Sequence, residues 1–572
     1  MWQTRPAMKS PLDALRRRRH AADEEPDGPT GRQGSGAVSD ERAARLLALA
    51  SRPLERGRPR VVLLAVDDPA WLVAALEESA RQPRITTVDP SVGPEALHVE
   101  LAARGPLDLV VDLTSDPAGA RADRVRAVLL HLRPSGVLLV ADAVGEALAE
   151  PLDAALRAAL APDQAALPLH DRFWGRAVDT VTVRHGHVAV TNGLRGFAQV
   201  REEQAGDYLR LRGPGAGQVL VELPASVVDN PAPILASEHD DATTYATHFD
   251  APPMQLREYA DVVCWPGQVV TQDHALLPET YRHGARVKLG NRFVDDVAPD
   301  FGRVSSGATP EPLAGTYFHL DSEFRGHFGH ALTEQIARLW AWPEAKRRHP
   351  DLKALVLTNR KRTTVAGWEY RLYQAAGIAP EDLVLADRPV RVERLLAGTP
   401  MFTQPEYIHA EIAEVYRRIG DDLAAEAPDR DYPERIFCSR RNDKRSCHNT
   451  PDVEAFFAER GFEIVYPEDY PLPEQVRMFR SATDLAGFGG SAMFTMAFVP
   501  EPKRVFLVSS ENYRAQNEAL VAAVLGHQLN VAWCRPDKTR AAGFKGREAM
   551  HSQFTFDPAR EGRFLAGLLD RG

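Results

Sequence analysis

Short apolar runs alternate with amphipathic segments from about residue 58 onward. The runs at residues 60–66, 84–89, 107–112 and 136–141 predict β-strands, and the segments 71–81 and 123–132 predict helices. Strands that alternate with helices usually form a mainly parallel sheet with right-handed crossovers. Residues 41–175 are therefore predicted to fold as a Rossmann-like α/β domain.

The pattern changes to short alternating strands between residues 178 and 225. Glycine-rich turns separate these strands, and the alternation returns between residues 261 and 301. We expect residues 176–395 to form a β-rich connector and a second lobe.

Two consecutive βαβ units are predicted in the last part of the chain, residues 396–572. The strands are expected at 435–438, 461–466 and 483–486, and the helices at 451–460, 472–480 and 492–498. Open α/β sheets bind ligands at the edge where the carboxyl ends of their strands meet. Polar residues that follow these strands are therefore candidates for a binding site.

Length and local composition indicate several domains and one tail. A chain of 572 residues exceeds the ~250–300 residues that one hydrophobic core supports. Residues 1–40 contain few large apolar side chains, so we expect a disordered tail. Its arginine cluster, Arg16 to Arg19, is interpreted as a solvated charge run, although peripheral contact with a membrane stays open.

Charge and cysteine content narrow the function classes. A formal charge of −10 and a pI near 6.0 argue against a nucleic-acid binder that works by neutralising phosphates. The four cysteines are too scattered for a CxxC pair and are expected to be free thiols. The sequence shows neither an apolar run of about 18 residues nor an apolar signal core, so a cytoplasmic location is expected.

The densest group of positive charges follows the strand predicted at 435–438. Ser439, Arg440 and Arg441 come directly after this strand, with Arg445 and Asn449 a few residues later. Arginine suits diphosphate binding because its planar fork meets phosphate oxygens bidentately and does not lose its proton. A solvated basic loop is the alternative, and the position at a strand end favours anion binding.

A glycine-rich turn follows the strand predicted at 483–486. Gly487, Gly489, Gly490 and Ser491 precede a predicted helix. Glycines allow close approach of the backbone to a ligand, and the first turn of a helix offers free amides to phosphate. The turn is weak evidence alone, but its spacing from the arginines suits one binding site.

The order of these motifs resembles glycosyltransferase family 61 of the bacterial capsular polysaccharide type. The matching motifs are Ser439-Arg440-Arg441, Asn449, Gly461-Phe462, Pro467-Glu468, Glu474-Gln475, Gly487-Phe-Gly-Gly-Ser491, Phe328-Gly-His330 with Glu334, and Arg338-Leu-Trp340. The resemblance covers residues 265–508, under half of the chain.

The resemblance implies an α/β architecture with a GT-B-like pair of Rossmann-like lobes, preceded here by the additional Rossmann-like domain. It further implies an inverting transfer in surface polysaccharide synthesis, without a bound metal and with no cofactor besides the nucleotide-sugar co-substrate. The partners would be that donor and a glycan or lipid-linked acceptor. The motifs specify neither the sugar nor the oligomeric state.

The same resemblance assigns roles to individual residues. It places Arg440, Arg441 and Arg445 on the diphosphate, Asn449 in support of that loop, Glu468 and Gln475 near the nucleoside or sugar, and Gly487, Gly489, Gly490 and Ser491 in the donor-binding turn. The family usually has a histidine where this chain has Gly489, so one side-chain contact is lost while backbone binding is unaffected.

His330 is the candidate general base of the transfer. An inverting displacement needs a group that removes the proton of the acceptor hydroxyl. Glu334 lies four residues later, where its carboxylate would orient the imidazole. His319, His327, His330 and Asp321 are an alternative set of metal ligands, but the arginine cluster favours neutralisation of the diphosphate by side chains without a metal.

Two alternatives remain open. Residues 107–142 resemble the later part of a class I methyltransferase domain, which would use S-adenosylmethionine. Its first βα turn, residues 67–70, reads Asp-Asp-Pro-Ala and lacks the glycines that a cofactor needs, so a degenerate domain is favoured. The second alternative is a non-catalytic protein that keeps the glycosyltransferase fold.

Overall fold

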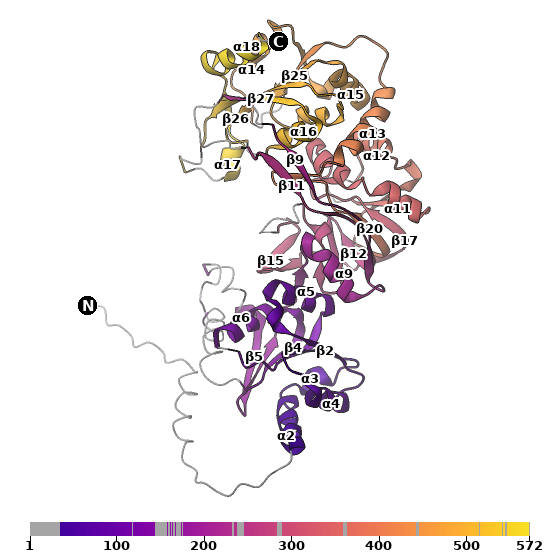
Figure 1. Cartoon of the computed structure of the whole chain (residues 1–572), viewed down its shortest axis with the longest axis vertical. Helices are drawn as coiled ribbons and strands as arrows, with labels where there is room; N and C mark the ends of the chain where they lie inside the picture. The colour runs from indigo at the N-terminus through magenta and orange to yellow at the C-terminus, as the bar shows by residue number, and fades with distance from the viewer. Residues whose placement is uncertain are drawn as a thin grey trace, which may run out of the picture. The chain divides into compact units, whose positions relative to one another are not determined.

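The computed structural model describes residues 35–570 with internal gaps. The gaps are residues 117, 143–156, 158–160, 162, 164–165, 168–172, 174, 232–233, 237–244, 283–288, 359–362, 442–444, 514, 540–541 and 544–545. Most of the predicted tail thus lies outside the described residues, and the first described helix begins at Ser35. The chain forms two compact units (Figure 1), which we describe separately.

The first unit comprises Met1–Ala216, Val269–Thr280 and Arg292–Gly307. Its six-stranded sheet has the order β2-β1-β3-β4-β6-β5. The strands are β1 (Arg60–Leu64), β2 (Arg84–Val88), β3 (Leu107–Asp112), β4 (Leu132–Val140), β5 (Val178–Arg184) and β6 (His187–Asn192). Strands β1 to β4 are parallel and β6 is antiparallel to both β4 and β5. The predicted parallel α/β domain is confirmed at the level of its first four strands.

Helices accompany this sheet because apolar residues recur along one face of each. They are α2 (Ser35–Leu47), α3 (Ser51–Leu54), α4 (Ala70–Ser79), α5 (Pro94–Arg104) and α6 (Ala118–Val128), with short 3₁₀ turns η1 (Pro90–Val92) and η2 (Leu129–His131). Leu46, Leu72 and Leu76 pack with the buried strand residues Leu63 and Leu109 in one core. Helices α4 and α6 occupy the regions where the sequence predicts helices.

The remainder of the first unit contains five strands of a larger mixed sheet. They follow the order β15-β16-β7-β14-β13 and are β7 (Phe197–Gln199), β13 (Val269–Gln272), β14 (Ala275–Leu276), β15 (Val294–Ala298) and β16 (Phe301–Val304). The short 3₁₀ turns η4 (Glu202–Gln204) and η5 (Pro278–Thr280) and helix α9 (Ala205–Arg212) connect or cover these strands.

Three buried histidines pack against one another and against Phe301 in this unit. His131 lies 4.9 Å from His98 and 5.8 Å from His274 between ring centroids, and 4.8 Å from Phe301. Burial lowers the pKa of all three rings, to about 4 for His274. These histidines are therefore neutral in the folded protein at neutral pH.

Acid is expected to destabilise this unit. Each ring titrates near pH 6.5 in the unfolded chain but at a lower pH in the folded one, so stability falls as the pH drops below 6.5. His274 alone would contribute a loss of about 3 kcal/mol near pH 4. Urea unfolding from pH 7 to pH 4 measures this slope. The slope should become smaller in His274→Gln, and an unchanged slope would contradict the assignment.

The second unit comprises Gly217–Gln268, Tyr281–Asn291 and Ala308–Gly572. Its first sheet has the order β8-β12-β20-β17-β18-β19. The strands are β8 (Gly217–Leu223), β12 (Met254–Trp265), β17 (Glu311–His319), β18 (Lys353–Leu357), β19 (Leu383–Ala386) and β20 (Val390–Gly398). Strands β20, β17, β18 and β19 are parallel, whereas β12 is antiparallel to both neighbours. These strands lie mainly in residues 176–395, the region predicted as a β-rich connector and a second lobe.

The second sheet of this unit is a parallel six-stranded sheet with the order β10-β27-β26-β25-β23-β24. Its strands are β10 (Ile234–Ala236), β23 (Arg435–Cys438), β24 (Glu463–Val465), β25 (Asp484–Phe488), β26 (Arg504–Ser510) and β27 (Gln528–Pro536), and β28 (Phe554–Thr555) pairs with β27. Strands β23, β24 and β25 coincide with the three predicted strands to within two residues at each end. The two βαβ units are confirmed.

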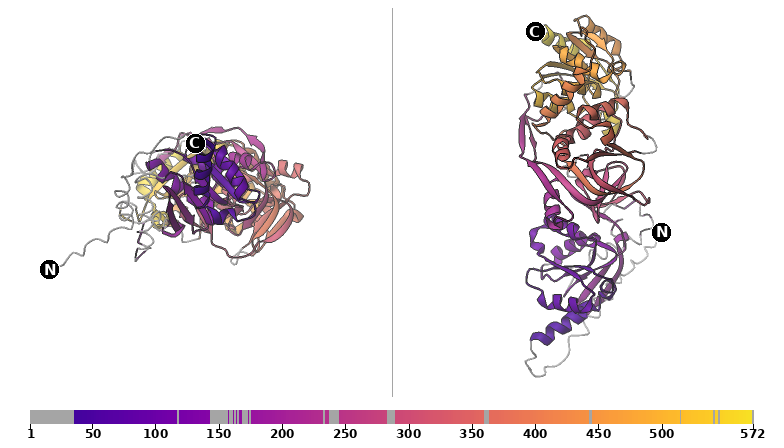
Figure 2. Two further views of the ribbon diagram at one scale, coloured as in Figure 1. Left: turned by 90° about the horizontal axis from the view of Figure 1, so that it is seen from below. Right: turned by 90° about the vertical axis from the view of Figure 1, so that its right-hand side faces the viewer.

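Helices lie around both sheets of the second unit (Figure 2). They are α10 (Phe328–His330), α11 (Trp342–Arg348), α12 (Gly367–Ala375), α13 (Ile412–Ala425), α14 (Thr450–Ala458), α15 (Leu472–Ser481), α16 (Asn517–Leu525), α17 (Gly546–Met550) and α18 (Arg563–Leu569). The short helical segments are η6 (Ala331–Gln335), η7 (Ile336–Arg338), η8 (Pro380–Asp382), η9 (Pro467–Asp469), η10 (Ser491–Phe498) and η11 (Pro558–Gly562). The short strands are β9 (Ser226–Asp229), β11 (His248–Ala251), β21 (Phe402–Thr403) and β22 (Tyr407–Ile408). The helix expected at 492–498 is the 3₁₀ helix η10.

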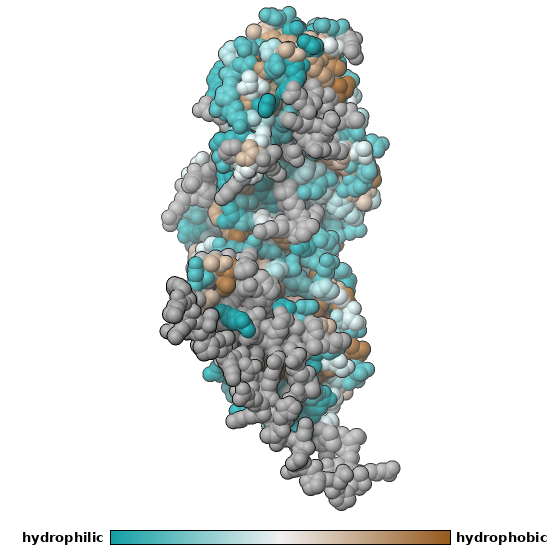
Figure 3. Space-filling view, turned by 90° about the vertical axis from the view of Figure 1, so that its left-hand side faces the viewer, coloured by the Kyte–Doolittle hydropathy of each residue, from teal (hydrophilic) through white to brown (hydrophobic). Residues whose placement is uncertain are grey.

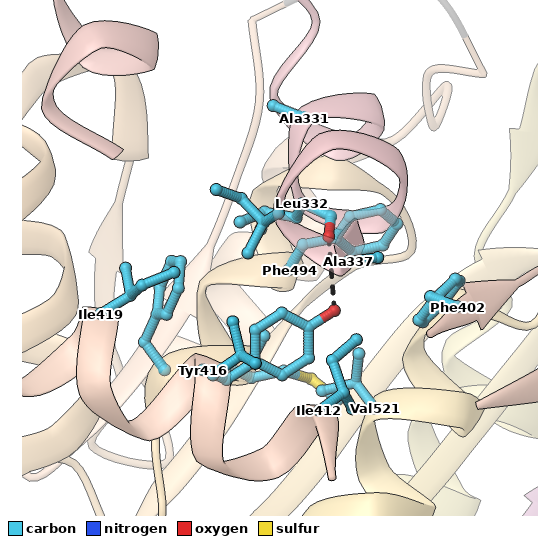
Figure 4. Close-up of a cluster of buried hydrophobic side chains, with 14 of the residues drawn as sticks. Ala331, Leu332, Ala337, Phe402, Ile412, Tyr416, Ile419, Phe494 and Val521 are labelled. Atoms are coloured by element: carbon cyan, nitrogen blue, oxygen red, sulfur yellow. Dashed lines mark hydrogen bonds between the residues drawn. The ribbon is translucent and has the colours of Figure 1, made fainter. Parts of the chain in front are cut away.

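One hydrophobic core joins the two sheets of this unit. Figure 4 shows Leu332 of η6, Tyr416 of α13, Phe494 of η10 and Val521 of α16 packed together, and the Tyr416 hydroxyl donates to the Leu332 carbonyl at 3.4 Å. The boundary predicted at residue 395 falls inside this unit.

The described residues on the face shown in Figure 3 are mainly hydrophilic. On the face shown in Figure 3, hydrophobic residues form only small separate patches. None of the helices in the described ranges is long and apolar enough to cross a membrane. The four cysteines are buried and are free thiols.

Candidate functional site

The arginines that follow β23 lie at the carboxyl edge of the parallel sheet. Strand β23 ends at Cys438, and its neighbour β25 ends at Phe488 in the glycine turn. Parallel pairing therefore brings the two predicted halves of the donor site to one edge, although about 45 residues separate them along the chain.

Arg440 and Arg445 are partly buried cations, each lying over an aromatic ring. The guanidinium of Arg440 lies 4.9 Å from the centroid of Phe488, and that of Arg445 lies 4.4 Å from the centroid of Tyr513. Neither arginine forms an ion pair within the described part of the chain, and the Nε atom of each is buried without a hydrogen-bond partner there.

The two positive charges of Arg440 and Arg445 favour the binding of an anion. Burial, and then the charge of Arg445, lower the pKa of Arg440 to about 10. Two like charges held close together in a partly desolvated site repel each other, and a bound anion would relieve that repulsion. Arg445 also has a positive φ of 57°, which is uncommon for a residue other than glycine and is often found at functional sites.

The glycine turn is packed too tightly for side chains. A Cβ at Gly487 would lie 2.6 Å from the Met493 sulfur, and one at Gly489 would lie 2.5 Å from the Ser509 hydroxyl oxygen. The histidine that the resemblance expects at Gly489 therefore has no room here, because Ser509 fills the space. A Cβ at Gly490, whose φ is 141°, would lie 3.3 Å from Nη2 of Arg445. The turn and the arginine pair thus adjoin.

Glu518 completes this arrangement and has no counterpart among the sequence predictions. Its buried carboxylate accepts a hydrogen bond of 2.6 Å from the amide of Gly490, the amide that the sequence assigns to phosphate. Burial raises the pKa of Glu518 to about 7, although the Gly490 amide and the charges of Arg445 and Arg440 oppose the rise. The carboxyl group therefore titrates near neutral pH inside the site.

Replacing Glu518 with glutamine is expected to stabilise the protein above pH 7. The raised pKa means that the carboxyl contributes its stability below about pH 4.5 and loses it as the pH rises to about 7. Glutamine keeps an acceptor for Gly490 without the charge, so the gain at pH 8 should approach about 3 kcal/mol. Urea unfolding at pH 8 and pH 5 tests this. A difference between the two proteins that is the same at both pH values would contradict it.

Arg441 is placed differently from the other two arginines. It is exposed, donates to Asp469 at 2.6 and 2.7 Å, lies 3.8 Å from Glu468 and lies 3.9 Å from the centroid of the Tyr466 ring. Arg441 therefore already has acidic partners at the end of β24. Glu468, half exposed, shares this edge with Arg441.

Asn449 and Gln475, both predicted at the donor site, form hydrogen bonds with backbone groups of neighbouring segments. The side chain of Asn449 donates to the Phe556 carbonyl at 2.9 Å and accepts from the Phe556 amide at 3.0 Å, which anchors the loop after Arg445 to the segment next to β28. Gln475 donates to the Tyr470 carbonyl at 2.9 Å and so holds the turn before α15. Asn449 thus supports the arginine loop from outside the site.

A second polar cluster surrounds His330. The His330 Nδ1 atom lies 2.7 Å from Glu334 Oε1, Arg282 donates to the same oxygen at 2.6 Å, and Ser322 donates to Glu334 Oε2 at 3.1 Å. Burial alone would raise the pKa of Glu334, but the hydrogen bond from His330 and the charge of Arg282 lower it to about 2. The structure therefore brings the predicted pair together and adds Arg282.

Two groups contact Nδ1 of His330: the carboxylate of Glu334 at 2.7 Å and Nη2 of Arg282, which can only donate, at 3.1 Å. Because the ionised carboxylate is the closer partner, we assign the proton to Nδ1, which leaves the Nε2 lone pair as the acceptor. Phe324 stacks on the imidazole with a centroid distance of 4.6 Å. About a fifth of the His330 side chain is exposed, so a substrate can reach it. His330 directly precedes the π-helical segment η6, and Glu334 lies within it; such segments are frequent at functional sites.

The histidine cluster and the glycine turn are in direct contact. A Cβ at Gly329, next to His330, would lie 2.9 Å from the ring of Phe494 and 3.3 Å from the Ser491 Cβ. Gly329 is thus packed against the first residues of η10. Ser491, predicted in the donor turn, and His330 therefore belong to one region of the second unit.

Two arginines of α6 contact the carboxyl ends of β3 and β4 in the first unit. Arg124 of α6 donates to the buried carboxylate of Asp112 at 3.0 Å and also to Thr114, at the end of β3. Arg121 donates to the carbonyls of Ala141 and Asp142, which follow β4. Arginine side chains thus lie at part of the edge where Rossmann-like folds bind their cofactors.

Among the residues that the structure describes, no group of three or more His, Cys, Asp or Glu side chains is placed to hold a metal ion. His319 is buried with a pKa well below its usual value because of burial and the charge of Arg338.

Comparison with known proteins gives one family match. Residues 328–506 match the family model described as Glycosyltransferase 61, which covers less than half of the chain. The matched segment runs from the first residue of α10 to β26 and contains the His330 cluster, the arginine pair and the glycine turn. The match supports glycosyltransferase activity in general. No curated protein shows significant similarity to the chain.

Similar solved structures are methyltransferases at low similarity. The MycE methyltransferase from the mycinamycin biosynthetic pathway, in complex with Mg and SAH, is 16% identical, covers 28% of this chain and 55% of its own, and has a TM-score of 0.24. A protein-(glutamine-N5) methyltransferase from Alicyclobacillus acidocaldarius is 19% identical, covers 29% of this chain and all of its own, and has a TM-score of 0.21. The chain spans about half the length of MycE. Likenesses at this level support no argument about activity.

Proposed function

We propose that the chain is an inverting, metal-independent glycosyltransferase that transfers a sugar from a nucleotide-sugar donor to a glycan or lipid-linked acceptor in surface polysaccharide synthesis. The observation that carries this proposal is the pair Arg440 and Arg445, two partly buried cations with no ion-pair partner among the described residues, beside the turn at Gly490. The family match over the same segment supports it.

The arginine pair would bind the diphosphate of the donor. Each guanidinium can donate two parallel hydrogen bonds to phosphate oxygens, and its charge stabilises the negative charge that develops on the leaving diphosphate. Stacking on Phe488 and Tyr513 holds both side chains in place before the ligand arrives. The catalytic gain comes from this preorganisation, because little reorganisation is needed as the bond breaks.

His330 would act as general base through Nε2. As the acceptor oxygen attacks the anomeric carbon and the bond to the diphosphate breaks, Nε2 takes the proton of the acceptor hydroxyl. Glu334, held by Arg282 and Ser322, stabilises the imidazolium that forms. The product diphosphate leaves with the electron pair of the broken bond. Because the acceptor oxygen attacks from the face opposite the diphosphate, configuration inverts at that carbon.

The two sheets of the second unit would serve as the two lobes of a GT-B-like architecture. The parallel sheet from β23 to β27 would carry the donor, and the mixed sheet with β17 and β18 would lead to the acceptor side through the loop that holds His330. Glu468 and Gln475, at the same edge as Arg441, would lie near the nucleoside or the sugar. We place this enzyme in the cytoplasm, where nucleotide sugars are available.

Thermal unfolding with added nucleotides tests this function. A ligand that binds only the folded chain raises the melting temperature, so UDP, GDP, CDP and dTDP should be compared with S-adenosylmethionine at equal concentration. The proposal expects a rise with at least one nucleoside diphosphate and none with S-adenosylmethionine. A rise with S-adenosylmethionine alone would favour the methyltransferase alternative and sink this proposal.

A further inference from the structure

Four arginine side chains line one cavity in the first unit. The cavity has a volume of about 230 Å³, and Arg60, Arg84, Arg104 and Arg212 are among the residues around it. Arg60 and Arg84 are the first residues of β1 and β2, so the cavity lies at the amino edge of the parallel sheet. This edge is opposite to the one where Rossmann-like folds bind their cofactors.

Backbone carbonyls hold two of these arginines rigidly. Nη1 of Arg60 donates to the Gly105 carbonyl at 2.6 Å, and Nη1 of Arg212 donates to the Ala103 carbonyl at 3.3 Å. These carbonyls belong to the last turn and the cap of α5, where the helix dipole favours positive charge. The capping uses one nitrogen of each guanidinium for backbone contact and fixes the orientation of the rest.

The charges around the cavity are not balanced by its acidic neighbours. Asp273 accepts from Arg212 at 2.8 Å and lies 3.9 Å from Arg60, while Glu100 accepts from Arg104. Arg84 makes no ion pair with any residue that the structure describes, and Nε of Arg212 has no hydrogen-bond partner there. Two carboxylates thus face four guanidinium groups.

The pKa of Arg60 also reflects this excess of positive charge around the cavity. Burial lowers the pKa of Arg60, the charge of Asp273 opposes this, and the nearby charges of Arg212 and Arg84 lower it further. A protein with a net charge of −10 has no general need for such a cluster. The unbalanced positive charge of the four arginines therefore favours the binding of an anion in this cavity.

We propose that this cavity binds the phosphate group of a small anionic ligand, at a site separate from the donor site. A phosphate has several oxygens that accept hydrogen bonds from more than one guanidinium at once, and arginine matches that geometry better than a point charge does. The preformed positions of Arg60 and Arg212 reduce the entropy lost on binding. The first unit is thereby a ligand-binding domain that uses the amino edge of its sheet.

Calorimetric titration with pyrophosphate tests this site in the full chain. The titration is made on a protein that carries Arg440→Gln and Arg445→Gln, so that the proposed donor site does not contribute. We expect saturable binding that weakens at least tenfold in Arg60→Gln and several-fold in Arg84→Gln. Arg84 is exposed and unpaired in the described chain, so its replacement does not threaten folding.

Two further variants test whether the binding of pyrophosphate depends on the arginines of this cavity. Asp273→Asn removes the carboxylate that competes for Arg212 and Arg60, so it should strengthen binding several-fold. Arg210→Gln is the matched control, since Arg210 lies on the same helix as Arg212 but is exposed and paired with Asp207. It should leave binding unchanged. No binding in the Arg440→Gln, Arg445→Gln protein, or binding that is equal in Arg84→Gln, would overturn the proposal without bearing on the donor site.

Discussion

Replacing both Arg440 and Arg445 with glutamine is expected to weaken the binding of a nucleoside diphosphate at least 100-fold. A hydrogen bond to a charged group contributes about 1.5–3 kcal/mol, so two arginines on one diphosphate account for about 3–6 kcal/mol. The fold should survive, because the substitution removes two repelling charges that have no ion-pair partner in the described chain. Calorimetric titration of wild type and variant measures the loss.

Arg441→Gln is the matched control for this experiment. Arg441 follows Arg440 directly, but it is exposed and already paired with Asp469. Its replacement should change the dissociation constant only a few-fold. If Arg441→Gln weakens binding as much as the double substitution does, the diphosphate binds at the outer edge near β24 and our placement of it is wrong.

Replacing His330 with glutamine is expected to lower kcat by a factor of about 10²–10⁴ without weakening the binding of the donor. General base catalysis typically contributes an acceleration of this size. Glutamine has nearly the reach of histidine but cannot take the proton from the acceptor hydroxyl. The dissociation constant of the nucleoside diphosphate, measured by titration, should stay within a few-fold of wild type.

Replacing Glu334 with glutamine distinguishes two effects of Glu334 on His330: orientation of the imidazole ring and stabilisation of the positive charge that forms on it. The neutral amide can still accept from Nδ1 of His330, but it no longer stabilises the imidazolium, so kcat should fall less than in His330→Gln. Arg282 would lose its ionic partner in this variant, which makes thermal unfolding a necessary control. Full activity in His330→Gln would remove His330 from the mechanism, whatever the effect of Glu334→Gln.

Local patterns predicted the elements that carry the donor site. The strands β23 and β25 and their polar ends follow from apolar runs, glycines and adjacent arginines, which are all near neighbours in the sequence. The parallel order of the strands then brings Arg440 over Phe488, at the end of β25. His330 and Glu334 were also paired correctly because four residues span about one helical turn.

Contacts between distant segments could not be predicted in the same way. Arg282 reaches Glu334 from 52 positions away, and Glu518 binds the Gly490 amide from 28 positions away. No local signal distinguishes these two side chains from the other charged residues of the chain. Burial of Glu518 depends on the packing of α16, which only the three-dimensional structure gives.

The different places of the three arginines illustrate the same limit. In the sequence, Arg440 and Arg441 are adjacent and look equivalent. Successive residues just after a strand point in different directions, so Arg440 turns toward Phe488 and Arg441 toward Tyr466. The family resemblance gave both the same role, whereas the geometry favours Arg440 and Arg445.

Release of nucleoside diphosphate from a panel of nucleotide sugars tests the central claim most directly. Wild type, the Arg440→Gln, Arg445→Gln protein and Arg441→Gln should be incubated with each donor and a mixture of glycan acceptors, and the freed diphosphate measured over time. The account predicts release from at least one donor by wild type and Arg441→Gln, with a loss of at least 100-fold in the double variant. Release that is equal in all three proteins, or absent from every donor, would contradict it.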